Sequence, residues 1–271
     1  MAPVAVCTSL QNLCLRSCLL KKIRGIGDLT NLVSIELYDN KIKKLEGFEK
    51  LVNLETLDVS FNRIKVIEGL DSLANLKKLY IANNRITEIT GLTGLTSLEM
   101  IDLGSNKISK IENLDHLVNL KELWLGKNKI GKIEGIETLT KLVRLDIQSN
   151  RLTAIGDGLQ TLVALQELYL GHNAIEKIEG LENLKDLNTL DFTSNRIASC
   201  AGLSTLSKLE ELWMGYNLVA TFDTVAEIDP ANVPLKTIYL EHNPIAKEFT
   251  YRTQLKKIHA GLTQIDATYV R

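Results

Sequence analysis

An asparagine recurs along the chain at an almost constant interval, and this period constrains the fold more than any other feature. The nine steps between successive asparagines are 22, 22, 22, 22, 22, 23, 22, 22 and 26 residues. A fixed period in this range predicts a solenoid, because so short a turn of chain buries its apolar side chains only against neighbouring turns. The ladder asparagines are Asn40, Asn62, Asn84, Asn106, Asn128, Asn150, Asn173, Asn195, Asn217 and Asn243.

The same frame surrounds each ladder asparagine. It reads L-x-x-L-x-L-x-x-N, then x-I-x-x-I-(E/x)-G-L-x-x-L, as in LEMIDLGSN at 98–106 and LQELYLGHN at 165–173. Residues 10–18 fit this frame with Cys18 in the asparagine place, which gives eleven rungs over 1–243, the first one a cap. The frame resembles the 22-residue form of the leucine-rich repeat. The resemblance implies an α/β solenoid with a curved parallel β-sheet on the concave face and short 3₁₀ or irregular turns on the convex face.

The amide side chains and the end of the chain complete the expected fold. A buried amide both donates and accepts hydrogen bonds, so we interpret the asparagines as a structural ladder that satisfies loop backbone groups. Leu255, Ile258 and Leu262 follow Pro244 at helical spacing, which predicts a helical C-terminal cap over 244–271. Residues 229–234 are expected to form a surface loop. The whole chain, 1–271, is predicted to be a single solenoid domain.

Composition excludes several classes of protein. Lysine and arginine total 32 against 33 aspartates and glutamates, so the basic surplus typical of a nucleic-acid binder is missing. No apolar run reaches the roughly 18 residues that a membrane helix needs. Met1–Leu20 lacks the basic start of a signal peptide, and four cysteines suit a reducing compartment. We therefore expect a protein of the nucleus and cytoplasm.

The outward strand position between the two leucines carries the functional signal. Leaving out Cys14 of the cap rung, its ten residues are five acids and five aromatics, with no base. Alternating carboxylates and rings suit a basic protein partner, through ion pairs and cation–π contacts. This acidic-aromatic column consists of Glu36, Asp58, Tyr80, Asp102, Trp124, Asp146, Tyr169, Asp191, Trp213 and Tyr239.

A second row of like charge follows the asparagines. In seven rungs the next residue is basic: Lys41, Arg63, Arg85, Lys107, Lys129, Arg151 and Arg196. Such a row is able to bind phosphate or RNA. The loop carboxylates Glu46, Glu68, Glu112, Glu134 and Glu179 lie nearby in each repeat, and we interpret the row as part of a charge-mixed solvated edge. No nucleic-acid partner is expected.

Residues for catalysis are not grouped in the sequence. His172 and His242 share a repeat position three rungs apart, and no histidine has zinc-site spacing. Cys14 is expected to point outward and Cys18 inward, while Cys200 takes an apolar slot. No catalytic residue, metal or cofactor is predicted, and the chain is not expected to be an enzyme.

Three short sequence segments resemble one family more specifically than the repeat frame does. They are LWLGKNKI at 123–130, YLEHNP at 239–244 and QIDATYVR at 264–271. These segments resemble the leucine-rich-repeat regulatory subunit of protein phosphatase 1, the regulatory subunit 7 family. The resemblance covers essentially the whole chain. It implies a non-catalytic monomer, active in the cell cycle and mitosis, that binds the phosphatase catalytic subunit with its concave face, with or without a third regulatory protein. It implies contacts at Asp58, Tyr80, Asp102, Trp124, Asp191, Glu211, Trp213 and Tyr239.

Two other functional classes remain open from the sequence. One is a ciliary or dynein-associated leucine-rich-repeat scaffold that uses the same face for another basic protein. The other is a spliceosomal subunit of the U2 A-prime type, which has fewer repeats. A bacterial adhesin of the internalin kind shares the 22-residue period but needs a secretion signal, which is not expected here.

Overall fold

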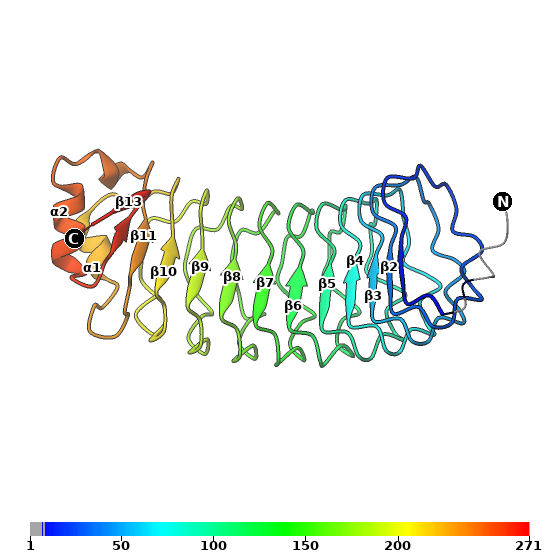
Figure 1. The fold of residues 1–271 in the computed structure, drawn as a ribbon. Coiled ribbons are helices and arrows are strands. Elements are labelled where there is room, and N and C mark those ends of the chain that lie inside the picture. The colour runs from blue at the N-terminus through cyan, green and yellow to red at the C-terminus, as the bar shows by residue number, and fades with distance from the viewer. Residues whose placement is uncertain (1–6, 8, 271) are drawn as a thin grey trace. The chain divides into compact units, whose positions relative to one another are not determined.

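The computed structural model describes residues 7 and 9–270. The expectation about a secretion signal over Met1–Leu20 falls partly on residues outside this range. The chain consists of two compact units, Met1–Lys129 and Ile130–Arg271. Each unit is a stack of short parallel strands, one per repeat (Figure 1).

In the described part of the first unit, six three-residue strands pair in register with their sequence neighbours. They are β1 (Asn12–Cys14), β2 (Ser34–Glu36), β3 (Thr56–Asp58), β4 (Lys78–Tyr80), β5 (Met100–Asp102) and β6 (Glu122–Trp124). Each residue lies beside the residue at the same repeat position in the next rung, as Leu57 lies beside Leu79. The constant period therefore sets the register.

The second unit continues the pattern and adds a cap. Its parallel strands are β7 (Arg144–Asp146), β8 (Glu167–Tyr169), β9 (Thr189–Asp191), β10 (Glu211–Trp213), β11 (Thr237–Tyr239) and β12 (Gln264–Ile265), and β13 (Thr268–Tyr269) pairs antiparallel with β12. Its helices are α1 (Phe222–Ala226), the 3₁₀ helix η2 (Pro244–Lys247) and α2 (Tyr251–Ile258). The predicted parallel-sheet solenoid is confirmed.

Strand alternation separates the core from the outward face. The middle residue of every strand from β2 to β11 is fully buried, as Leu57 and Leu190 illustrate, and the residues on either side face outward. Return segments add further buried leucines and isoleucines, and hydrogen bonds such as Leu32 N–H to Leu29 O close their turns. The core is thus a column of aliphatic side chains within each unit.

The ladder asparagines bond loop backbone groups in adjacent rungs. Asn84 donates from Nδ2 to Val59 O and to Ile81 O, both at 3.1 Å, and its Oδ1 accepts the Ile64 N–H at 2.9 Å. The other ladder positions repeat this arrangement, and most of these side chains are buried. One amide per rung therefore satisfies groups that the three-residue strands leave unpaired.

Glycine is required where the return segments approach the previous rung. Gly91 has φ +66°, and a Cβ there would collide with the carbonyl oxygen of Ile67. Asn113 replaces glycine at the equivalent position with φ 60° and bonds Ile89 O through its side chain. The positions share a positive φ, which favours glycine, and at Gly91 the close approach of the previous rung adds a steric reason.

The first rung differs from expectation. Cys18 is exposed, and its thiol contacts only the nearby Arg16 carbonyl at 3.2 Å. Asn40 of the next rung instead bonds the first-rung backbone, donating to Leu15 O and accepting the Leu20 N–H. The prediction that Cys18 points inward is wrong, because the first rung has no earlier turn for an inward side chain at this position to bond. Cys200 is buried, and burial raises the pKa of its thiol to about 12.

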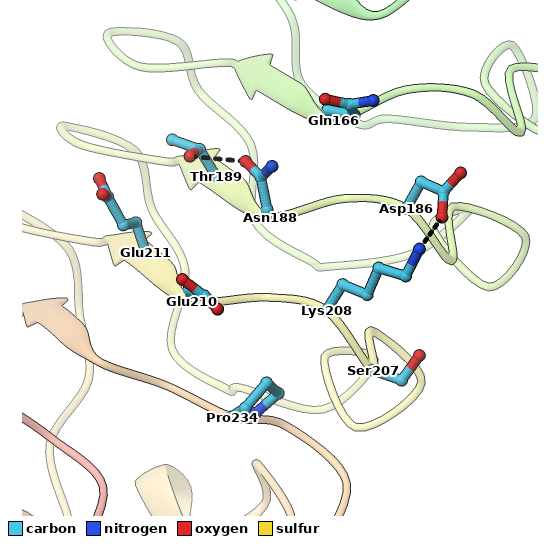
Figure 2. Close-up of a pocket in the computed structure, with 9 residues that line it drawn as sticks. All are labelled: Gln166, Asp186, Asn188, Thr189, Ser207, Lys208, Glu210, Glu211 and Pro234. Atoms are coloured by element: carbon cyan, nitrogen blue, oxygen red, sulfur yellow. Dashed lines mark hydrogen bonds and ion pairs between the residues drawn. The ribbon is translucent and has the colours of Figure 1, made fainter.

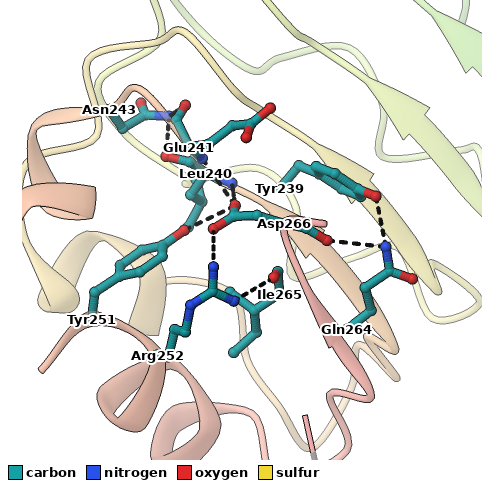
Figure 3. A network of polar contacts seen from close by, with 9 residues as sticks. All are labelled: Tyr239, Leu240, Glu241, Asn243, Tyr251, Arg252, Gln264, Ile265 and Asp266. Atoms are coloured by element: carbon teal, nitrogen blue, oxygen red, sulfur yellow. Dashed lines mark hydrogen bonds and ion pairs between the residues drawn. The ribbon is translucent and has the colours of Figure 1, made fainter. Parts of the chain in front are cut away.

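At the other end, a carboxylate closes the ladder (Figure 3). Asp266, buried and with φ 51°, accepts the N–H groups of Leu240 and Glu241 at 3.0 Å. Its oxygens also contact the Tyr251 hydroxyl at 3.2 Å and the Arg252 guanidinium at 3.5 Å, both from α2. The cap helix is therefore held to the last rung by one aspartate. The predicted helix ends at Ile258, before Leu262, which is nevertheless buried.

Replacing one ladder amide tests this account. We expect Asn84→Ala to lower the free energy of unfolding by about 2 kcal/mol or more, because two carbonyls and one N–H lose a buried partner. The exposed Asn75, whose amide bonds only Val52 O, provides the matched control Asn75→Ala. Urea denaturation measures both. Equal small losses would contradict a ladder role for Asn84.

Candidate functional site

Two columns of side chains cover the outward face of the strands. The third strand position carries the acidic-aromatic column, and the first position carries a second column that includes Glu122, Glu167 and Glu211. Sequence reasoning named only Glu211 from the second column, although strand alternation places its whole length on this face. Lys78 and Arg144 also lie there, so the face is not entirely free of bases.

The column aspartates are engaged within their own rungs. Asp58, Asp102, Asp146 and Asp191 each accept the backbone N–H two residues later, at 2.7 to 2.9 Å. An aspartate is short enough to form this turn, which explains aspartate rather than glutamate at the position. Asp146 and Asp191 are buried. Their carboxylates therefore stabilise the loop as well as adding negative charge to the face.

Small residues beside the column make room for these carboxylates. A Cβ on Gly171 would lie 2.9 Å from Asp191 Oδ2, and one on Gly104 would lie 3.0 Å from Asp102 Oδ1. A larger residue at either position would therefore displace the neighbouring carboxylate.

In the first unit, the face carries Glu36, Asp58, Tyr80, Asp102 and Trp124, all partly exposed. Glu36 pairs with Arg16 at 3.6 Å, and the Trp124 indole N–H donates to Glu122 at 3.3 Å. Burial, followed by the carboxylates of Glu122, Asp58 and Asp102, raises the pKa of the Tyr80 hydroxyl. The raised pKa agrees with a negative potential around this ring.

In the second unit, three rings of the column gather on β8, β10 and β11. The centroid of Trp213 lies 6.3 Å from that of Tyr169 and 6.2 Å from that of Tyr239. The Tyr169 hydroxyl donates to Glu167 at 2.8 Å, and Glu167 forms a bidentate pair with Arg144 at 2.6 and 2.7 Å. The Arg144 hydrogen bond lowers the pKa of Glu167, while burial and then the Glu167 hydrogen bond raise that of Tyr169.

The indole of Trp213 has an unused donor. Its Nε1 is buried and has no hydrogen-bond partner within residues 7 and 9–270. Beside the ring lies a hollow of about 270 Å³, lined by Trp213, Tyr239, Glu241, Thr193 and Gly215. A buried donor without an acceptor is costly, so the position of this ring carries an uncompensated free-energy cost.

The last ring of the column is held by the C-terminal tail. Gln264 of β12 donates from Nε2 to the Tyr239 hydroxyl at 2.6 Å and to Asp266 O at 3.0 Å (Figure 3). Gln264 belongs to the C-terminal segment 264–271, one of the three segments that carry the family resemblance. This segment therefore holds the ring of Tyr239 in place and also forms part of the cap.

A larger polar hollow of about 710 Å³ lies where the strands β8, β9 and β10 begin (Figure 2). Asp186 and Lys208 pair across it at 2.5 Å, and the Thr189 hydroxyl donates to Asn188 at 2.9 Å. Glu211 reaches its edge, and its carboxylate makes no ion pair or hydrogen bond with any described residue. Glu211 thus adds an unpaired charge next to the rings.

The loop glutamates near the basic row pair mainly with lysines outside the row. Glu68 pairs with Lys44, Glu112 with Lys110 and Glu134 with Lys132. Within the described chain, the bases of the row in the first unit have no carboxylate within 4.0 Å, and in the second unit Arg196 contacts Glu176 at 4.0 Å. The glutamates reach closer lysines in their own or an adjacent rung, and the interpretation of the row as part of a charge-mixed solvated edge stays a prediction.

Two further observations bear on the kind of site present. Among the described residues, no group of three or more histidine, cysteine, aspartate or glutamate side chains is placed to hold a metal ion. No helix in this part of the chain is long and apolar enough to span a bilayer. The outward sheet face, with its carboxylates and aromatic rings, is therefore the candidate functional site.

Comparisons with known proteins agree with this architecture. Family models described as leucine-rich repeats match residues 30–72, 52–94, 74–116, 118–161 and 140–197, more than half of the chain. The search of curated proteins finds no match.

Several solved structures share the fold. An internalin, InlF, of Listeria monocytogenes has 23% identity and a TM-score of 0.73, over 97% of this chain and 82% of that one. The leucine-rich-repeat protein LIC12759 of Leptospira interrogans has 24% identity and a TM-score of 0.76, over 97% and 74%. A structure of a TLR13–ssRNA13 complex has 24% identity and a TM-score of 0.75, over 96% of this chain and 40% of that one. These likenesses concern the fold alone.

The protonation of Asp102 gives a test of the face's electrostatics. Burial, with a smaller contribution from Asp58, raises the pKa of Asp102 despite the Gly104 N–H bond. The folded state then holds this proton more tightly than the unfolded state, so stability from it falls as pH rises through the folded pKa.

We therefore expect Asp102→Asn, which keeps an acceptor for Gly104 but never ionises, to have a higher Tm than the parent protein at pH 7. The gap should close near pH 3, where both side chains are neutral. Scanning calorimetry at the two pH values measures it, and an equal gap at both would contradict the assignment.

Proposed function

Since this chain belongs to the leucine-rich-repeat family, whose members act as scaffolds for protein–protein interaction, we propose that it is a non-catalytic regulatory subunit of protein phosphatase 1. In this proposal the acidic-aromatic column and Glu211 dock a basic surface of the phosphatase catalytic subunit. The fold is typically a non-enzymatic scaffold, in keeping with a regulatory role. We place its action in the nucleus and cytoplasm, during the cell cycle and mitosis.

The ring cluster of the second unit is the observation that carries the proposal. Trp213 is tilted against Tyr169 and T-shaped against Tyr239, with ring centroids 6.3 and 6.2 Å apart, and the carboxylates of Glu167 and Glu211 lie in the adjoining column. Tryptophan and tyrosine dominate binding energy at protein interfaces, and a lysine or arginine between such rings and carboxylates gains both cation–π and ionic contacts.

The aspartates and the aromatic residues of the column have different roles, and this difference also supports the outward sheet face as the binding surface. Asp146 and Asp191 are buried and hydrogen-bonded to their loops, so they contribute negative electrostatic potential to the face rather than direct contacts with a partner. Among the described residues the Glu211 carboxylate has no ion pair or hydrogen bond, and the partly exposed ring of Trp213 lines a hollow of about 270 Å³. A basic side chain of a partner therefore meets an unpaired charge beside an aromatic ring.

The family resemblance supports the identity of the partner. Two of the segments that carry it, 239–244 and 264–271, contain Tyr239, Gln264 and Asp266, which are joined by hydrogen bonds in the cap. The residues that distinguish this chain from other leucine-rich repeats thus set the position of an interface ring. This link favours the phosphatase over the ciliary scaffold and the spliceosomal subunit.

Calorimetric titration with the phosphatase catalytic subunit tests the proposal. We expect Trp213→Ala to weaken binding about 30-fold, or about 2 kcal/mol, because it removes the central ring of the cluster. Phe249→Ala, at a fully exposed ring of the cap region, is the matched control and should bind within about twofold of the parent protein.

Unchanged binding by Trp213→Ala would contradict the assigned face. Absence of binding by the parent protein at micromolar concentration would contradict the phosphatase as partner and favour the ciliary scaffold.

A further inference from the structure

Five bases stand in one line on the loop side of the first unit. Each follows a ladder asparagine, and each backbone N–H donates to a carbonyl one rung back at 2.7 to 2.8 Å. These hydrogen bonds hold the bases at the rung spacing of about 4.8 Å, so the row extends over roughly 19 Å. The first-unit row consists of Lys41, Arg63, Arg85, Lys107 and Lys129.

The side chains of this row are unpaired. In the described part of the chain, none of the five makes an ion pair or a side-chain hydrogen bond. Four of them are exposed, and Lys41 is half-buried. Lys43 and Lys65, also exposed, add charge near one end of the row. The first unit therefore presents an uncompensated cationic line at a fixed spacing.

The unbroken run of bases covers the first unit from Lys41 onward and one further rung, at Arg151. At the same repeat position, the second unit has Arg151 and Arg196 separated by Ala174, and then Leu218 and Pro244. Repeat geometry alone does not demand a base here, because alanine, leucine and proline occupy the position in the same fold. A cause other than folding is needed for five consecutive bases.

We propose that the first-unit row binds an acidic segment of a partner protein. An extended chain rises about 3.3 Å per residue, so a segment of about six residues covers the row with carboxylates on alternate residues. Each exposed ion pair contributes little alone and is screened by salt, so binding requires several pairs at once.

The neighbourhood of the row favours an acidic peptide over RNA. Proteins that bind single-stranded nucleic acid combine a basic groove with rings on which bases stack. The segments 83–87, 105–109 and 127–131, which surround Arg85, Lys107 and Lys129, contain no aromatic residue. Phe61, two residues before Arg63, packs against Tyr38 with ring centroids 4.8 Å apart. The outward sheet face of the same unit is acidic and would repel a long polyanion.

Fluorescence anisotropy with the full chain tests the proposal. The probe is a labelled peptide of alternating glutamate and glycine, about twelve residues long, with an oligouridylate of equal length as the comparison ligand. The row variant is Arg63→Gln/Arg85→Gln/Lys107→Gln, and Arg85→Gln alone is the milder second variant. The control, Lys177→Gln/Arg196→Gln/Lys257→Gln, removes the same charge from exposed positions of the second unit that lie outside the unbroken run.

We expect the peptide to bind at low salt, the row variant to bind about tenfold more weakly, and Arg85→Gln to show a smaller loss in the same direction. The control should stay within about twofold. Equal losses in the row variant and the control would overturn the assignment to this row, as would absence of peptide binding. Tighter binding of the oligouridylate through the same row would overturn the acidic-peptide partner.

Discussion

The amide of a single asparagine in each rung is the interaction on which the rest of the structure depends. Strands of three residues pair too few backbone groups to hold a coil of 22 residues together. The asparagine Nδ2 and Oδ1 bond the loop carbonyls and N–H groups that remain, as Asn84 does with Val59, Ile81 and Ile64. Where the repeats end, Asp266 performs the equivalent task with its carboxylate and joins the cap to the last rung.

This solution leaves the outward face free to vary. Core positions are fixed by burial and the loop by the amide, so only side chains at the first and third strand positions distinguish one rung from the next. Aspartate rungs use that freedom partly to bond their own loops. Aromatic rungs do not, and in the second unit their rings instead contact one another around Trp213. The face thus combines self-satisfied carboxylates with rings that have unused binding capacity.

The repeat made most of the fold predictable. Period and leucine spacing were enough to predict the parallel strands and the outward position between the leucines, because each follows from a local rule applied rung by rung. Features outside the repeat were missed: helix α1 lies in the 26-residue step, and β12 and β13 belong to the tail. Cys18 was misplaced because the first rung has no earlier turn to bond.

The candidate site was predictable in position but less so in detail. Alternation placed the column on the outward face, yet spacing does not reveal which side chain reaches which neighbour. The loop bonds of Asp146 and Asp191, the Arg144–Glu167 pair and the bond from Gln264 to Tyr239 all depend on side-chain reach between rungs. For the same reason Glu112 and Glu134 pair with Lys110 and Lys132 rather than with the basic row.

Hydroxyl-radical footprinting of the chain, alone and with the phosphatase catalytic subunit, tests the central claim that the outward face around Trp213 is the binding surface. Oxidation should fall at Trp213 and Tyr239 in the complex and stay unchanged at Phe249 and Leu218, which are exposed elsewhere on the second unit. Protection of Phe249 or Leu218 with no change at Trp213 and Tyr239 would contradict it.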